Sequence, residues 1–171
     1  MAGLLVMPNT LGIDEDRWVD ATSGIVYDTV MIERIVMDTN IAVAGLRSSR
    51  GASYRVLQLI GTGHFDIALS VPLVLEYEDV LKREGVAPAV SAGDIDALIQ
   101  YWCSVAHLSE IHFLWRPVLR DPKDYHILEL AVAAGSGLIV THNTRDFAQS
   151  PTWGVEAIRP GEFLRRIGVT S

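Results

Sequence analysis

Short apolar runs alternate with amphipathic segments from about residue 32 to the end of the chain. Apolar and polar residues do not strictly alternate in the runs within 35–37, 65–70 and 138–143. This pattern is typical of strands buried on both faces. Segment 111–117 is a further candidate strand, and a last short strand and helix are expected within 155–168. The sequence therefore predicts several short, buried strands.

Helical spacing of apolar residues separates these runs. With Gly or Pro at the boundaries, it predicts helices within 48–65, 70–85, 94–106 and 121–135. Ser70 and Ser91 stand where helix caps are expected. Strands that alternate with helices predict an α/β fold, in which a central, mostly parallel sheet is covered by helices on both faces.

The first 30 residues do not follow this alternation. We interpret residues 1–30 as an N-terminal appendage of unknown role and residues 31–171 as the working domain. Segment 23–32 could still pair with the sheet as an extra edge strand. Met31 and Met37 are each a plausible start of a conventional domain.

The chain carries a formal charge of -7, which argues against a nucleic-acid partner if it is taken as a whole. Residues 1–33 hold six acidic residues and one arginine, so only -2 remains for residues 34–171. If acids of the working domain bind divalent cations, that domain comes close to neutral. The charge therefore does not exclude a nucleic-acid substrate.

No apolar stretch reaches the roughly 18 to 20 residues of a membrane span, and the N-terminus lacks the pattern of a secretion signal. We therefore expect a cytoplasmic protein with no membrane association. Cys103 is the single cysteine, which excludes an internal disulfide and a thiolate-rich zinc site.

Acidic residues follow several of the predicted strands. Ligands of a parallel α/β sheet bind outside the carboxyl ends of the strands, so four distant segments are each expected to bring one carboxylate to the same edge. The four acids are Asp38, Glu76, Asp124 and Asp146. These acids could instead have ordinary structural roles. Asp38 could end a strand in a turn, Glu76 could lie on a solvated helix face and Asp124 could complement a helix dipole.

Crowded carboxylates normally need a cation. Oxygen ligands without a convergent histidine or cysteine suit Mg2+ or Mn2+, and the natural chemistry is phosphodiester hydrolysis. His126 is not expected among the ligands, because two residues from Asp124 correspond to about 200° on a helix. Neutral side chains suited to orienting carboxylates and water are Thr39, Asn40, Thr141 and Asn143.

Four segments, "VMDTNI", "LVLEYEDVL", "LRDPKDYHILELAVAAG" and "LIVTHNTRDF", resemble in this order the motif blocks of the PIN domain family. Within that family the chain is similar to VapC-like toxin components of bacterial toxin–antitoxin pairs. The resemblance implies an α/β/α sandwich, Mg2+- or Mn2+-dependent ribonuclease activity, homodimerisation and a cognate antitoxin. It also implies that the metal carboxylates are Asp38, Glu76, Asp124 and Asp146.

The fourth motif departs from the family pattern. Many members have T-x-D-x-D, whereas this chain has Thr141, Asn143 and Asp146, so an amide replaces one acid and the next acid comes one residue later. This substitution leaves open an alternative function, a PIN-fold module that binds RNA or protein with a weakened metal site. A haloacid-dehalogenase-like phosphatase is disfavoured, since Asn40 stands where it needs a second acid.

Basic residues flank the candidate acids. As phosphate contacts they would position RNA without reading its sequence, and as solvated surface residues they would have no special role. The candidates are Arg47, Arg50, Arg120, Lys123 and Arg145.

Overall fold

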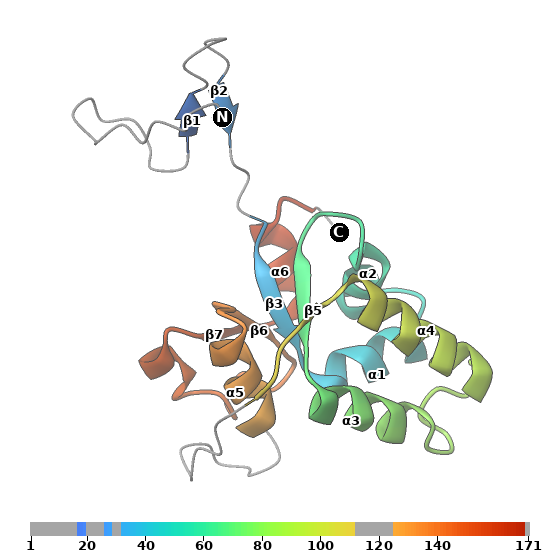
Figure 1. The fold of residues 1–171 in the computed structure, drawn as a ribbon. Coiled ribbons are helices and arrows are strands. Elements are labelled where there is room, and N and C mark those ends of the chain that lie inside the picture. The colour runs from blue at the N-terminus through green and yellow to red at the C-terminus, as the bar shows by residue number, and fades with distance from the viewer. Residues whose placement is uncertain (1–16, 20–25, 29–31, 112–124, 170–171) are drawn as a thin grey trace. The chain divides into compact units, whose positions relative to one another are not determined.

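The structure is a computed structural model that describes residues 17–19, 26–28, 32–111 and 125–169. The chain divides into two compact units, Met1–Ile32 and Glu33–Ser171. The larger unit contains a sheet of five strands in the order β5-β4-β3-β6-β7, in which every pairing is parallel (Figure 1). The strands are β3 (Arg34–Met37), β4 (Asp66–Leu69), β5 (His107–Leu108), β6 (Leu138–Val140) and β7 (Glu156–Ile158).

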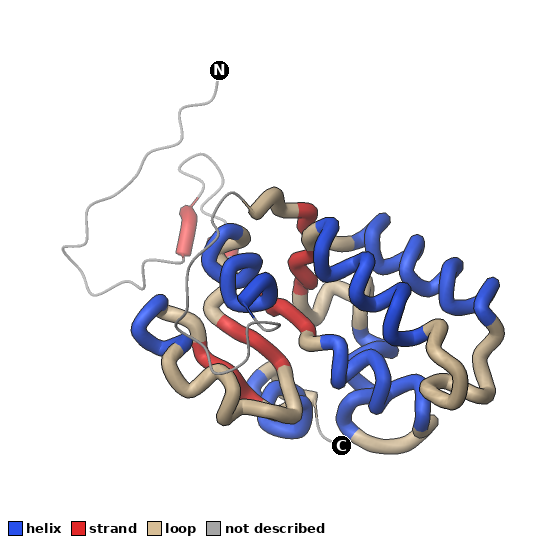
Figure 2. Tube along the Cα trace, turned by 90° about the horizontal axis from the view of Figure 1, so that it is seen from below, coloured by secondary structure: helices blue, strands red, loops and turns tan. Residues whose placement is uncertain are grey.

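Helices lie on both sides of the strands, which confirms the predicted three-layer α/β/α sandwich (Figure 2). They are α1 (Thr39–Arg47), α2 (Ala52–Leu59), α3 (Val71–Leu81), α4 (Ala92–Val105), α5 (Tyr125–Ala133) and α6 (Pro160–Arg166), with a short 3-10 helix, η2 (Ser150–Trp153). α5 packs against β3, β4 and β6, whereas α2 packs against α1 and α6. In the described part of the chain, no helix combines the length and hydropathy needed to cross a bilayer.

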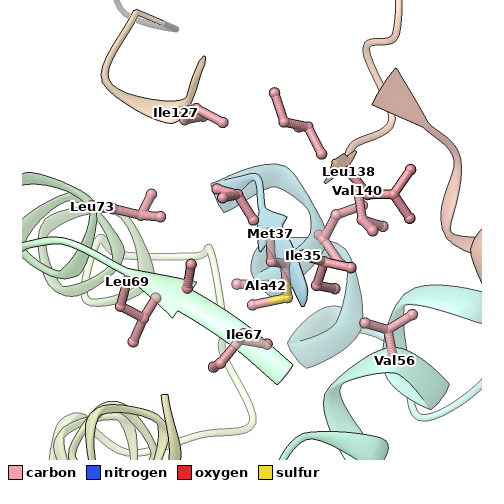
Figure 3. Close-up of a cluster of buried hydrophobic side chains, with 14 of the residues drawn as sticks. Ile35, Met37, Ala42, Val56, Ile67, Leu69, Leu73, Ile127, Leu138 and Val140 are labelled. Atoms are coloured by element: carbon pink, nitrogen blue, oxygen red, sulfur yellow. The ribbon is translucent and has the colours of Figure 1, made fainter. Parts of the chain in front are cut away.

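The core explains why the strands are apolar throughout. Ile35, Val36 and Ile139 are completely buried, as expected for strands covered on both faces (Figure 3 shows this cluster of side chains). Trp102 is also completely buried and meets Tyr77 edge to face, with ring centroids 5.6 Å apart. Trp102 is therefore a core residue rather than a platform for stacking bases.

Local sequence signals fix several helix ends. Ser91 caps α4, because its hydroxyl accepts a hydrogen bond from the Asp94 amide at 3.2 Å and the Asp94 carboxylate accepts one from the Ser91 amide. Ser70 occupies the cap position of α3, but its side chain makes no capping hydrogen bond. α1 is absent from the helices predicted by sequence, since the pattern offered no separate boundary between β3 and α2.

The edge strand β5 lies outside the segments that the sequence predicted as strands. β5 covers His107–Leu108, just before the predicted segment 111–117, of which residues 112–117 lie outside the described residues. β5 pairs with β4 through Leu69 and Leu108. The sequence therefore did not predict β5, and the strand at 111–117 stays a prediction.

The smaller unit contains two strands, β1 (Arg17–Val19) and β2 (Val26–Asp28), which pair antiparallel as a separate sheet. The expectation that segment 23–32 adds an edge strand to the main sheet is therefore wrong, because its strand β2 pairs with β1.

A protein truncated to begin at Met31 should fold and act as the full chain does, because every element of the five-stranded sheet lies after that residue. Circular dichroism and thermal unfolding of both lengths would measure this, followed by the RNA assay described below. Loss of folding or activity on truncation would show that residues 1–30 belong to the working unit.

Candidate active site

A pocket of about 530 Å3 lies where β3 ends. Its walls come from Asp38 and one side of α1, the second half of α3 and the loop after β6, three segments that are distant in sequence. The lining residues are Asp38, Thr39, Asn40, Val43, Ala44, Arg47, Glu76, Val80 and Asn143. The fold thus brings Asp38 and Glu76, two of the four predicted carboxylates, into one pocket together with Asn143.

Asp38 follows β3 directly and is the N-cap of α1. Its carboxylate is only 7% exposed and accepts hydrogen bonds from the Asn40 amide (3.1 Å), the Asn40 side chain (2.7 Å) and the Thr141 hydroxyl (2.6 Å). The sequence allowed two interpretations of Asp38, as a turn residue and as a site residue. These are compatible, since Asp38 caps a helix and also faces the pocket.

Thr141 and Asn40 attach the loop after β6 to the start of α1. Thr141 is completely buried, and its hydroxyl accepts hydrogen bonds from the Asn143 amide (3.0 Å) and the Asn40 side chain (3.1 Å). The side-chain oxygen Oδ1 of Asn40 accepts one from the backbone N–H of His142 (3.2 Å). This network places Asn143 at the pocket, because β3 and β6 are neighbours in the sheet.

Glu76 reaches the pocket from α3 and meets a histidine from α5. His126 Nε2 lies 2.8 Å from Glu76 Oε2, and the two side chains are 22% and 34% exposed. The spacing of His126 from Asp124 along the chain does not reveal this contact, because Glu76 lies on a different helix. Packing of α3 against α5 is what brings the two side chains together.

Burial and hydrogen bonding act in opposite directions on the two acids. Burial raises the pKa of Asp38, against hydrogen bonds from Thr141 and Asn40 that lower it, and the charge of Glu76 raises this pKa further. The pKa of Glu76 is lowered, chiefly by its contact with His126. Ionised Asp38 is thus in an unfavourable place in the metal-free protein, which a nearby cation would relieve.

A raised pKa for Asp38 has a definite sign for stability. The contribution of this carboxyl to folding is fully present below its ordinary pKa of 3.8 and is lost as pH rises through the raised pKa of the folded state. Without metal, the free energy of unfolding of the wild type minus that of Asp38→Asn should therefore fall between about pH 4 and neutrality. Urea unfolding in EDTA across this range would measure it, and a difference that grows with pH would contradict the assignment.

The remaining predicted residues lie in different places. Asp124, Arg120 and Lys123 are outside the described residues. Asp146 is partly buried, its amide donates to the Asn143 carbonyl oxygen at 3.0 Å, and it is not among the residues that line the pocket.

The described basic candidates differ from one another. Arg47 lines the pocket while its guanidinium donates to the carbonyl oxygens of Val86 (2.9 Å) and Gly85 (3.3 Å). Arg50 and Arg145 are exposed. Only Arg47 is therefore placed at the pocket.

A divalent cation fits the donor chemistry of this pocket in part. Carboxylate and amide oxygens from Asp38, Glu76, Asn40 and Asn143 line it, and such oxygens suit Mg2+ or Mn2+. Across residues 32–111 and 125–169, however, no three His, Cys, Asp or Glu side chains are grouped closely enough to hold a metal ion. The described acids alone therefore do not complete a metal site.

Chains of two solved structures are similar to this chain. A chain of the DNA-bound VapBC complex from Salmonella typhimurium is similar with a TM-score of 0.51 and 16% identity, over 76% of this chain and 99% of that one. A chain of VapBC2 from Rickettsia felis, bound to a DNA fragment from their promoter, has a TM-score of 0.49 and 17% identity, over 74% of this chain and 98% of that one. No curated protein matches the sequence significantly.

The sequence profile of the PIN domain matches residues 34–145. This match covers most of the chain and three of the four segments quoted above in full, and it reaches into the fourth. The resemblance predicted from the motifs is confirmed, and the chain belongs to the PIN domain family.

Proposed function

We propose that this PIN domain protein is a metal-dependent endoribonuclease and the toxin of a toxin–antitoxin pair. The observation that carries the proposal is the placement of Asp38 and Glu76 in one pocket by β3 and α3, two separate elements of the fold. A solvated helix face or a simple turn does not require these two acids to meet. Burial, and to a smaller degree the charge of Glu76, raises the pKa of Asp38, a cost that function can explain.

In this proposal Mg2+ or Mn2+ is held by Asp38, Glu76, Asp124 and Asp146. When bound, such a cation activates water and offsets charge that develops on the phosphate. The chain itself orients the carboxylates: Thr141 and Asn40 fix Asp38 by hydrogen bonds, and Thr39 borders both acids in the pocket. Asn143 supplies an amide at the same pocket, suited to binding through water or to orienting a neighbour.

The family and one similar structure support the proposed partners. The Salmonella structure is a VapBC complex, which supports a cognate antitoxin for this chain. We propose an RNA substrate, a homodimer and a cytoplasmic location. The phosphate contacts would come from Arg47, Arg50, Arg120, Lys123 and Arg145, of which Arg47 borders the pocket.

A second candidate function is supported by the fourth motif. Asn143 lines the pocket where many PIN domains have an acid, and Asp146 is not among the lining residues. With fewer acids at the pocket, the fold would serve as a module that binds RNA or protein without cleaving RNA.

Incubation of the purified protein with a total RNA pool would distinguish the two functions. The reactions contain Mg2+, Mn2+ or EDTA, and the new RNA ends are sequenced. The nuclease proposal expects discrete new ends with 5'-phosphate and 3'-hydroxyl groups in either metal and none in EDTA. Binding of RNA without new ends in any condition would favour the binding module.

A further inference from the structure

His126 is a side chain at the pocket's edge that the functional proposal does not use. It lies on α5, and its Nε2 atom is 2.8 Å from Oε2 of Glu76 on α3. This contact joins α5, which packs against β3, to α3, whose Tyr77 hydroxyl donates to the Met37 carbonyl oxygen at the end of β3. The Glu76 side chain that His126 contacts lines the pocket.

Packing of α5 does not depend on this contact. The helix is held by its apolar residues Ile127, Leu128, Leu130 and Ala131, each at most 2% exposed. His126 is on the accessible side, with about a fifth of its side chain exposed. A purely structural role would be filled as well by an apolar side chain at this position, so the polar contact calls for another explanation.

Glu76 has a particular need for such a partner. A glutamate that is one third exposed on a helix has several rotamers available, and fixing one of them costs side-chain entropy. The charge of Asp38 in the same pocket also pushes the Glu76 carboxylate away from the position that a shared cation would require. A polar contact that holds the Glu76 carboxylate counters both effects.

We infer that His126 is a positioning residue, which holds the Glu76 carboxylate at the pocket by donating a hydrogen bond from Nε2. A neutral imidazole with its proton on Nε2 is sufficient for this role. The inference rests on the proposed function, because it assigns His126 to the orientation of a metal carboxylate. Outer partners of this kind contribute about 10- to 100-fold to metal affinity.

The test compares His126→Leu and His126→Gln in the full chain, with His64→Gln as a control. Gln retains an N–H donor at a similar reach, whereas Leu removes it. His64 is exposed and contacts Thr62 rather than the pocket. Binding of Mn2+ to the metal-free proteins is followed by the electron paramagnetic resonance signal of free Mn2+, and thermal unfolding in EDTA checks that each variant is folded.

We expect His126→Leu to bind Mn2+ about 10- to 100-fold more weakly than the wild type, and His126→Gln and His64→Gln to remain within about threefold. Wild-type affinity in a folded His126→Leu, or an equal loss in His126→Gln, would overturn the positioning role. A wild type that binds no Mn2+ would instead overturn the proposed function and the inference with it.

A second measurement tests the same inference without any His126 variant, so it can be made even if His126→Leu does not fold. Nitrogen-15 NMR of the wild type at about pH 8, above the ordinary pKa of histidine, reports which ring nitrogen carries the proton. We expect the proton of His126 on Nε2, and a shift of its resonances in Glu76→Gln that His64 does not show. A proton on Nδ1 would overturn the inference.

Discussion

Replacing Glu76 by Gln should abolish RNA cleavage, whereas replacing Glu78 by Gln should leave it unchanged. Both acids lie on α3, but only Glu76 borders the pocket and contacts His126. Glu78 is exposed and pairs with Lys82 at 2.7 Å. Residues two apart on a helix point to nearly opposite sides, so these substitutions make the same chemical change in two environments.

We expect Glu76→Gln to lower the rate by at least about 100-fold. Residues that only support a metal ligand contribute up to about this factor, so loss of the ligand itself should cost no less. Initial rates on one RNA at saturating Mn2+ would measure it, with circular dichroism to confirm that both variants are folded. Equal losses in the two variants would show that the face of α3 has been assigned incorrectly.

Replacing Asp38 by Asn should remove the stabilisation of the protein by metal. The wild type should gain about 2.7 kcal/mol in free energy of unfolding at a free metal concentration of 100 times the dissociation constant. The variant should lose most of this gain together with its ribonuclease activity, because an amide is a much weaker ligand for a hard cation.

The hydrogen bonds of Asp38 make the metal-free comparison less simple. One carboxylate oxygen accepts from both the Asn40 side chain and the Thr141 hydroxyl, so an amide nitrogen placed there would face donors. We expect a cost on the order of 1 kcal/mol for these lost bonds, offset in part by relief of the buried charge. The response to metal, not the stability in EDTA, therefore separates a metal ligand from a helix cap.

Ser91→Ala provides the matched control, since Ser91 caps α4 and lies outside the pocket lining. It should cost about 1 kcal/mol equally with and without metal. Unfolding of the three proteins in EDTA and during a Mn2+ titration would measure both effects. If Asp38→Asn gained as much from Mn2+ as the wild type, Asp38 would be a cap only.

The fold could be predicted from sequence because its strands are buried on both faces. Apolar runs such as Ile35–Met37 lie between helical segments. This arrangement is compatible with few folds other than a parallel sheet covered by helices on both faces. The edge strand of the sheet was harder to predict, since β5 has only His107 and Leu108, and both are exposed. α1 was missed because its only start signal, Asp38, also had a turn interpretation.

The sequence predicted those features of the candidate site that follow from the order of strands and helices. Asp38 and Glu76 meet because each follows or accompanies a strand that ends at the same edge of the sheet. His126 could not be found in this way, since its contact depends on how α5 packs against α3 rather than on spacing along the chain. The choice between Asn143 and Asp146 likewise depends on the path of a loop that periodicity does not describe.

Anomalous X-ray diffraction from crystals grown with Mn2+ tests most directly the proposal that the pocket beside Asp38 and Glu76 binds the divalent ion on which RNA cleavage depends. The expected result is a strong anomalous peak in the pocket, in contact with carboxylate oxygens of both Asp38 and Glu76. A protein that cleaves RNA with Mn2+ yet shows its anomalous peak elsewhere, or none at this pocket, would contradict the claim.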